Sequence, residues 1–282
     1  MEFKPAQCPT CGGSLQVPEN RTSVRCMYCG GAVVVREAIN AAISASVPNL
    51  LKLATAAAQS QNHKEAYEYF TRVLELDSTN SEAWAGKASA AGRLSNGQSF
   101  RIPEMINYYA RSLEVVADNR RANAEESAGN SISQVITQYY NRLRSDLSPA
   151  FADGQTWLIY LNGLNDILEA IHTAHRLLPR SVAILQTGIY ICSDNAGYLR
   201  YANKYNGQVS RRPLPPEMAA VVEGRKQTYT HALSSVAPRV TPVSIENDYR
   251  PGLFDQMTPA RWVLIIVLML FIIGMVSSAL EK

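Results

Sequence analysis

The residues of this chain best suited to chemistry are four cysteines near its start, which form two C-x-x-C pairs with fourteen residues between them. Two glycines follow each pair and allow the backbone to turn back toward the sulfur atoms. Four thiolates can surround a divalent ion tetrahedrally, and zinc suits such a soft, closed set of ligands. The spacing therefore predicts one structural zinc ion, held by Cys8, Cys11, Cys26 and Cys29.

The elements that must position these cysteines are short and rich in β-strand signals. Residues 14–17 read as a strand, a turn follows at 18–20, and Ala32 to Val35 read as another strand after the second pair. So small a unit cannot bury a sufficient core, so we expect metal binding and folding to be one event. We also expect this unit to share no core with the rest of the chain.

The segments CPTCGG and CMYCGG resemble the two metal-binding turns of a zinc ribbon, and Val17, Val24 and 33–35 match its strands. This resemblance covers about thirty residues and implies the fold and the metal, but no particular function. Two disulfide bonds are an alternative, yet the start of the chain has no apolar stretch typical of a secretion signal. A rubredoxin-like iron centre would have a longer spacer and an aromatic core, and a thioredoxin-like motif would need a βαβ unit.

From residue 47 to residue 236 the sequence is typical of helices. Turn-forming residues recur at intervals of about 12 to 25 residues, which is the length of single helices. Ser46 to Pro48 predict the start of the first helix, because proline is favoured in a first turn. We expect antiparallel helical hairpins over this whole region, without a sheet.

The helical region also contains a repeat. Trp84 lies 34 residues after Leu50, and the segment LDSTNSEAW joins the two copies, so residues 47–80 resemble a tetratricopeptide repeat. A second repeat starts at Ser81, with about five residues inserted around 95–103. The resemblance implies a solenoid whose concave surface binds peptides. The Lys/Asn clamp that some members use for a terminal carboxylate is not matched, because Leu51 and Thr55 occupy its expected positions.

The last part of the chain predicts a membrane anchor. Residues 237–261 carry four prolines among polar residues and read as an extended tether. Residues 262–280 carry no charge and would form a helix about 28 Å long, close to the thickness of a bilayer's hydrocarbon core. Arg250 and Arg261 precede it, so we expect a tail anchor in a bacterial inner membrane or a eukaryotic membrane, with the N-terminal domains in the cytoplasm.

Other residues that could do chemistry have simpler interpretations. His172 and His175 share a helix face, but no acidic or cysteine motif accompanies them, so we expect a solvated pair. Cys192 lies in an apolar stretch and is expected to be a buried small residue rather than a nucleophile. Two tyrosine pairs are expected to pack inside the helical region: Tyr108, Tyr109, Tyr139 and Tyr140.

The charge distribution gives little reason to expect nucleic acid. The chain has 27 Lys and Arg against 24 Asp and Glu, and its 46% hydrophobic content excludes wholesale disorder. Residues 198–239 are locally basic and predict either a solvated face or attraction to anionic lipid headgroups. The cations counted there are Arg200, Lys204, Arg211, Arg212, Arg225, Lys226 and Arg239.

The sequence thus predicts a mainly α protein, an α-solenoid with a small β zinc ribbon and one transmembrane helix. Its function is predicted to be that of a non-enzymatic, membrane-tethered adaptor that binds partner proteins, with no small-molecule substrate. The alternative is a membrane-attached regulator that binds nucleic acid through the ribbon and residues 198–239, and a third is an enzyme that uses Cys192 or the histidines. The predicted domains are a ribbon at 1–37, a linker at 38–46, the helical region at 47–236, the tether at 237–261 and the anchor at 262–280.

Overall fold

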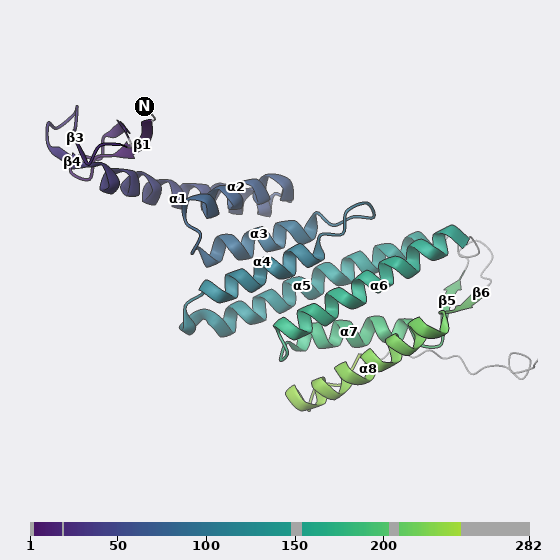
Figure 1. Cartoon of the computed structure of the whole chain (residues 1–282). Helices are drawn as coiled ribbons and strands as arrows, with labels where there is room; N and C mark the ends of the chain where they lie inside the picture. The colour runs from purple at the N-terminus through teal and green to yellow at the C-terminus, as the bar shows by residue number, and fades with distance from the viewer. Residues whose placement is uncertain (1–2, 19, 148–153, 203–208, 244–282) are drawn as a thin grey trace, which may run out of the picture. The chain divides into compact units, whose positions relative to one another are not determined.

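The computed structural model of the chain describes residues 3–18, 20–147, 154–202 and 209–243 (Figure 1). They belong to one compact unit, Met1–Ser244. Short strands open the chain, and helices make up most of the remaining described residues, with a small hairpin between the last two helices. The predicted mainly α class with a small N-terminal β module is therefore confirmed.

The N-terminal module consists of two antiparallel hairpins. Strand β1 (Phe3–Gln7) pairs with β2 (Ser14–Pro18), and β3 (Ser23–Arg25) pairs with β4 (Ala32–Val34). In each hairpin, a C-x-x-C turn lies between the two strands, and together the turns form a zinc-ribbon-like arrangement. The sequence did not indicate β1, because Pro5 interrupts its pattern and the strand forms through pairing with β2.

Helix α1 (Val35–Gln59) corrects the predicted domain boundary. Residues 38–46, which we expected to be a linker, are helical, and Pro48 lies inside the helix instead of at its start. Alanine and glutamate near its beginning favour a helix. Val35 and Ala38 are also buried in the core of the N-terminal module, so this module and the first helix share a core.

Helices α2 (His63–Leu76), α3 (Ser81–Arg93) and α4 (Ile102–Val115) follow, and each contacts the helix before it. Asn62 and Asn80 cap α2 and α3, because their side chains accept hydrogen bonds from backbone N–H groups in the first turn. The loop between α3 and α4 coincides with the predicted insertion. Small buried residues lie where these helices meet, among them Ala54, Ala66 and Ala83.

Helices α5 (Asp118–Leu147), α6 (Gly154–Leu177), α7 (Val182–Asn195) and α8 (Pro216–Val236) build the largest core of the described chain together with α4. Helix α5 contacts α4, α6 and α7, and α8 packs on α7. Large aliphatic side chains from α5, α6 and α7 fill the interior, including Ile132, Ile136, Leu164, Ile167, Ile171 and Ile191.

A hairpin between α7 and α8 shows that the prediction of helix without sheet was wrong at this place. Strand β5 (Tyr198–Ala202) pairs antiparallel with β6 (Val209–Pro213). Gly197 adopts a positive φ of 76° directly before β5 and turns the chain out of α7. The side chain of Leu199 is buried in the helical core and thereby anchors β5 to the helices.

No helix among the described residues is both long and apolar enough to cross a membrane. The predicted anchor at 262–280 and most of the predicted tether lie outside the described residues.

Candidate functional site

The two cysteine turns have the same backbone geometry, eighteen residues apart. In the first, the N–H of Cys8 donates to the carbonyl of Gly13 and the N–H of Gly12 donates to the carbonyl of Cys8, both at 2.9 Å. In the second, Cys26, Gly30 and Gly31 repeat these bonds at the same distance. Both turns need glycine at their tightest point, where φ is 71° at Gly12 and 73° at Gly30.

These turns bring the four cysteine sulfurs together. All four lie within 4.8 Å of one another, with Sγ–Sγ distances of 3.8 Å for Cys8–Cys29 and 3.7 Å for Cys11–Cys26. A regular tetrahedron of Zn–S bonds about 2.3 Å long has edges of about 3.8 Å. A disulfide would need about 2.05 Å between sulfurs, and all four cysteines are free. The geometry therefore fits a four-coordinate metal and not disulfide pairs.

The thiols also differ in their readiness to ionise. The backbone N–H of Cys11 points to the sulfur of Cys8 and lowers the pKa of Cys8 to about 6, against the opposing effect of burial. For Cys11, a backbone bond involving Gly13 lowers the pKa, but burial and the neighbouring sulfurs outweigh it and raise the pKa to about 12. Four thiolates so close together repel one another, and a divalent cation would remove that repulsion.

A second layer of contacts supports the cysteine turns, and the sequence did not reveal it. The Tyr28 ring packs on Gly13, where a Cβ atom would lie only 2.5 Å from the ring. The Tyr28 N–H donates to the sulfur of Cys26 at 3.4 Å, and Gln7 Nε2 donates to the carbonyl of Gly12 at 3.1 Å. Such contacts orient sulfur ligands around a metal. A tyrosine inside the second C-x-x-C pair was the available signal.

No protein-family profile matches this chain, and no curated protein matches it significantly.

Cys192 is buried in the core formed by α4 to α8, as the sequence predicted. Burial raises its pKa to about 12, with smaller opposing effects of Arg225 and Lys226. A thiol with so high a pKa is a poor nucleophile at neutral pH.

The two histidines of α6 are not the solvated pair that we predicted. His172 is exposed, but His175 is half-buried in a T-shaped contact with the ring of Tyr229, and its Nδ1 has no hydrogen-bond partner among the described residues. Burial lowers the pKa of His175, and the nearby His172 lowers it further. Among the described residues, the four cysteines are the group of metal-binding side chains close enough to share an ion.

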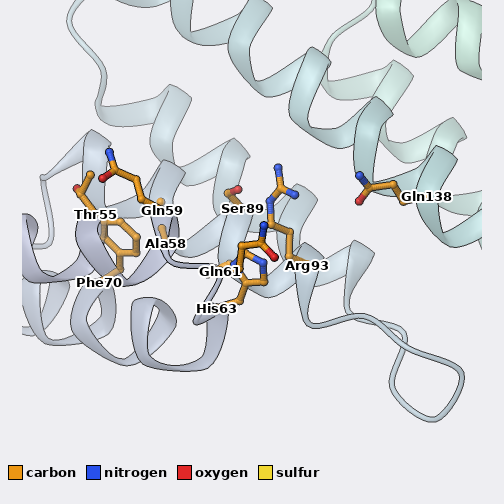
Figure 2. Close-up of a pocket in the computed structure, with 11 residues that line it drawn as sticks. Thr55, Ala58, Gln59, Gln61, His63, Phe70, Ser89, Arg93 and Gln138 are labelled. Atoms are coloured by element: carbon orange, nitrogen blue, oxygen red, sulfur yellow. The ribbon is translucent and has the colours of Figure 1, made fainter.

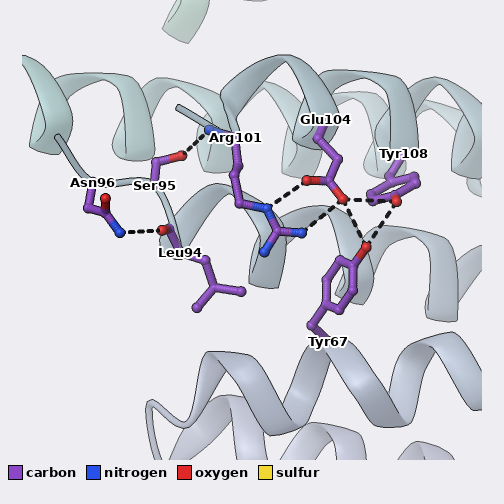
Figure 3. Close-up of polar contacts among 7 residues, drawn as sticks. All are labelled: Tyr67, Leu94, Ser95, Asn96, Arg101, Glu104 and Tyr108. Atoms are coloured by element: carbon purple, nitrogen blue, oxygen red, sulfur yellow. Dashed lines mark hydrogen bonds and ion pairs between the residues drawn. The ribbon is translucent and has the colours of Figure 1, made fainter. Parts of the chain in front are cut away.

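A hydrogen-bonded cluster joins α2 to α4 on the surface (Figure 3). The carboxylate of Glu104 accepts bonds from Tyr67 at 2.8 Å, from Tyr108 at 3.0 Å and from two nitrogens of Arg101 at 2.7 and 2.9 Å. Lys87 of α3 lies over the rings of Tyr67 and Tyr108, 4.9 and 4.8 Å from their centroids. Tyr108 is therefore part of a polar cluster as well as a packing residue.

A second polar network lies inside the helical core. Asp194 at the end of α7 accepts a hydrogen bond from the hydroxyl of Tyr140. It also forms an ion pair with Arg144, whose Nε lies 2.8 Å from Oδ2 of Asp194. The neighbouring Asn195 donates to Tyr140 at 2.8 Å and accepts from Tyr160 at 2.6 Å. This network ties α5, α6 and α7 together at one end of the bundle.

Two arginines of the basic residues 198–239 contact other residues of this chain. Arg225 of α8 donates to the carbonyl of Leu168 and pairs with Glu169 of α6. The guanidinium of Arg212 lies over the Trp157 ring, 4.5 Å from its centroid. The segment is therefore less available to an external partner than its sequence indicates.

A surface groove with a volume of about 700 Å³ lies between α1, α2, α3 and α5 (Figure 2). We call it the α1–α5 groove. Its lining residues are Thr55, Ala58, Gln59, Gln61, His63, Phe70, Gly86, Ser89, Ala90, Arg93 and Gln138. It is wide enough for a side chain with its flanking peptide groups.

Proposed function

We propose that this chain is a non-enzymatic adaptor, with a zinc ribbon at its N-terminus, a partner-binding helical region and a membrane anchor at 262–280. The observation that carries this proposal is the closed set of four sulfurs. Four protein ligands leave no coordination position for a substrate, so a zinc ion there would hold structure rather than perform catalysis.

Partner binding by the helical region rests on the tetratricopeptide-like repeat. Helix α2 ends at Leu76, Asn80 caps α3, and small residues such as Ala66 lie buried where helices meet. These features agree with the repeat spacing found in the sequence. Stacked helical pairs of this kind present extended grooves to peptides, and the α1–α5 groove is the surface that we assign to this role.

The membrane anchor rests on the uncharged residues 262–280, and its orientation rests on Arg250, Arg261 and the reduced cysteines. In the native cells, the chain should stay with the membrane after an alkaline wash, and a chain that lacks 262–280 should be released. Protease added to sealed cells should leave the N-terminal module intact. Recovery of the full chain in the soluble fraction would contradict the anchor.

The adaptor function is tested by purifying the tagged chain from detergent-solubilised membranes and identifying co-purifying proteins by mass spectrometry. We expect the same partner proteins in repeated purifications. An Ala66→Trp variant, which should disrupt α2, should lose them, and an exposed Glu68→Trp variant on the same helix should retain them. Partners that stay bound to a chain with an unfolded α2–α3 region would contradict the assignment.

The nucleic-acid alternative draws less support, because Arg212 and Arg225 contact Trp157 and Glu169 of this chain. Binding to generic DNA or RNA that weakens steeply with salt would favour it over the adaptor.

A further inference from the structure

The charges around the α1–α5 groove are one-sided. Of its eleven lining residues, Arg93 is the one with a permanent charge, and none is acidic. His63 also lines the groove, and burial together with the charge of Arg93 lowers the pKa of His63. Since the unperturbed pKa of histidine is about 6.5, His63 is mainly neutral at pH 7. The lining of the groove therefore carries a net charge of +1, which comes from the guanidinium of Arg93.

Arg93 is held in place by a neutral group. Its terminal nitrogen donates to Oε1 of Gln134 on α5 at 3.0 Å. Within the described part of the chain, no carboxylate forms an ion pair with Arg93. A guanidinium that is positioned by a neutral amide keeps its remaining donors for an anion, and its planar fork matches a carboxylate.

The rest of the lining offers neutral hydrogen-bonding groups around an apolar floor. Figure 2 shows Thr55 and Gln59 on one side of the groove and Gln138 on the other, with Arg93 between them. The Phe70 ring fills the space over Gly86, where a Cβ atom would lie 2.2 Å from the ring. Side-chain amides can bind both the N–H and the C=O groups of a peptide backbone.

We propose that the α1–α5 groove binds an extended segment of a partner protein through an aspartate or glutamate side chain, which pairs with Arg93 while the glutamines bind the backbone beside it. This inference rests on the proposed adaptor function and names the chemistry that the partner must carry. A carboxylate matches the single cation of the groove, whereas a phosphate carries close to two negative charges and would need further cations. Arg93 and Gln138 act here as binding residues.

The test uses the full chain in detergent and blocked decapeptides as probes. The peptides have Gly and Ser flanks, an acetylated N-terminus and an amidated C-terminus, and their central residue is Glu, Gln or phosphoserine. We expect the Glu peptide to bind about tenfold more tightly than the Gln peptide, which is the effect of one charge-assisted contact. The Arg93→Gln variant should lose this preference, and Gln138→Glu should lose it too, because it places a negative charge across the groove.

Arg180→Gln is the matched control, because Arg180 is an exposed cation that lines a different groove. It should keep the preference for Glu. Equal binding of the Glu and Gln peptides, an unchanged preference in folded Arg93→Gln or Gln138→Glu protein, or tighter binding of the phosphoserine peptide would overturn the inference. If partners still co-purify from membranes with the Arg93→Gln variant, this inference fails while the adaptor function stands. If no partner co-purifies with the unmodified chain, the adaptor function itself fails.

Discussion

The N-terminal module and the helical region are held together by different physical means. The module buries a small cluster, in which two of the buried residues are Cys8 and Cys26 themselves. The helical region buries a continuous core of large aliphatic and aromatic side chains from α4 to α8. Because burial of apolar area stabilises a fold roughly in proportion to that area, the helical region can fold by packing alone and the module cannot. We therefore expect the fold of the N-terminal module to depend on a metal ion and the fold of the helical region to be independent of it.

The largest expected effect is the loss of metal from the module. Cys26→Ser, or chelation of zinc, should unfold residues 3–34, because structural zinc contributes about 10–16 kcal/mol in small zinc-dependent folds. Hydrogen exchange should show loss of protection in β1 to β4 and in the first turns of α1, where Val35 and Ala38 pack on the module. Helices α4 to α8 should keep their protection.

The matched control is Cys192→Ser, which changes a cysteine outside the metal site and should leave the zinc content at one ion per chain. Elemental analysis that finds iron, or no metal in protein purified without chelator, would contradict the zinc site. Loss of protection throughout α4 to α8 after chelation would show that the two regions are not independent.

The second-largest expected effect concerns packing within the helical region. Ala66 of α2 is fully buried between helices, so Ala66→Trp should destabilise the helical region by about 3 kcal/mol through overpacking. Glu68→Trp, at an exposed position of the same helix, should change the free energy of unfolding by less than about 0.5 kcal/mol. Chemical denaturation measures both. Zinc content should be equal in the two variants, and a loss of zinc from Ala66→Trp would contradict the separation.

The sequence revealed the cysteine cluster because all its determinants are local. Cysteine spacing and the glycines that follow define each turn, so the four cysteines could be grouped without knowledge of the fold. The start of α1 could not be found in the same way, since it depends on Ala38 packing against strands that precede it in the chain. Pro48 gave a local signal for a helix start, and tertiary packing overrode that signal.

The helical region shows the same division between local and distant determinants. Asn62 and Asn80 are local determinants, because each caps the helix that begins directly after it, α2 and α3. The hairpin of β5 and β6 was missed because its pairing joins residues up to fifteen positions apart in the sequence. It also depends on the burial of Leu199 in the helical core, which the local sequence does not indicate. Arg101, Glu104 and Tyr108 have the spacing of neighbours on a helix, which could have revealed their cluster, but Tyr67 lies 37 residues before Glu104 and gave no such signal.

The third effect distinguishes polar contacts inside the helical core from packing. Asp194→Asn would remove the carboxylate that pairs with the guanidinium of Arg144, whose side chain is only 23% exposed, and should destabilise the chain by about 2 kcal/mol. Asp146→Asn changes an exposed aspartate near the end of α5 and should have almost no effect. Thermal unfolding of both variants measures the difference. Equal stability of the two would show that the network around Tyr140 and Asn195 contributes nothing beyond packing.

The smallest effect concerns the surface cluster of Glu104. Hydrogen bonds from Arg101 hold the pKa of Glu104 below its usual value, burial opposes this, and Tyr67 and Tyr108 add to the lowering. A carboxyl whose pKa is lower in the folded chain stabilises the fold above its unfolded pKa, and this contribution disappears as the pH falls through the folded pKa. Glu104→Gln should therefore destabilise the chain at pH 7. The expected loss is only about 1 kcal/mol, because the side chains of Arg101 and Glu104 are 25% and 30% exposed and solvent weakens their ion pair.

The difference in stability between Glu104→Gln and the unmodified chain should be constant near neutral pH and should shrink below about pH 4. Urea denaturation at pH 7, 5 and 3.5 measures it, and Glu114→Gln serves as the control. Glu114 pairs with Arg111 at 2.8 Å, but both side chains are about 60% exposed, so that variant should show little loss at any pH. A loss that is equal for Glu104→Gln and Glu114→Gln would mean that the tyrosine contacts across α2 and α4 add no stability. A loss of stability that is unchanged between pH 7 and pH 3.5 would show that the shape of the Glu104 side chain, and not its charge, causes the effect.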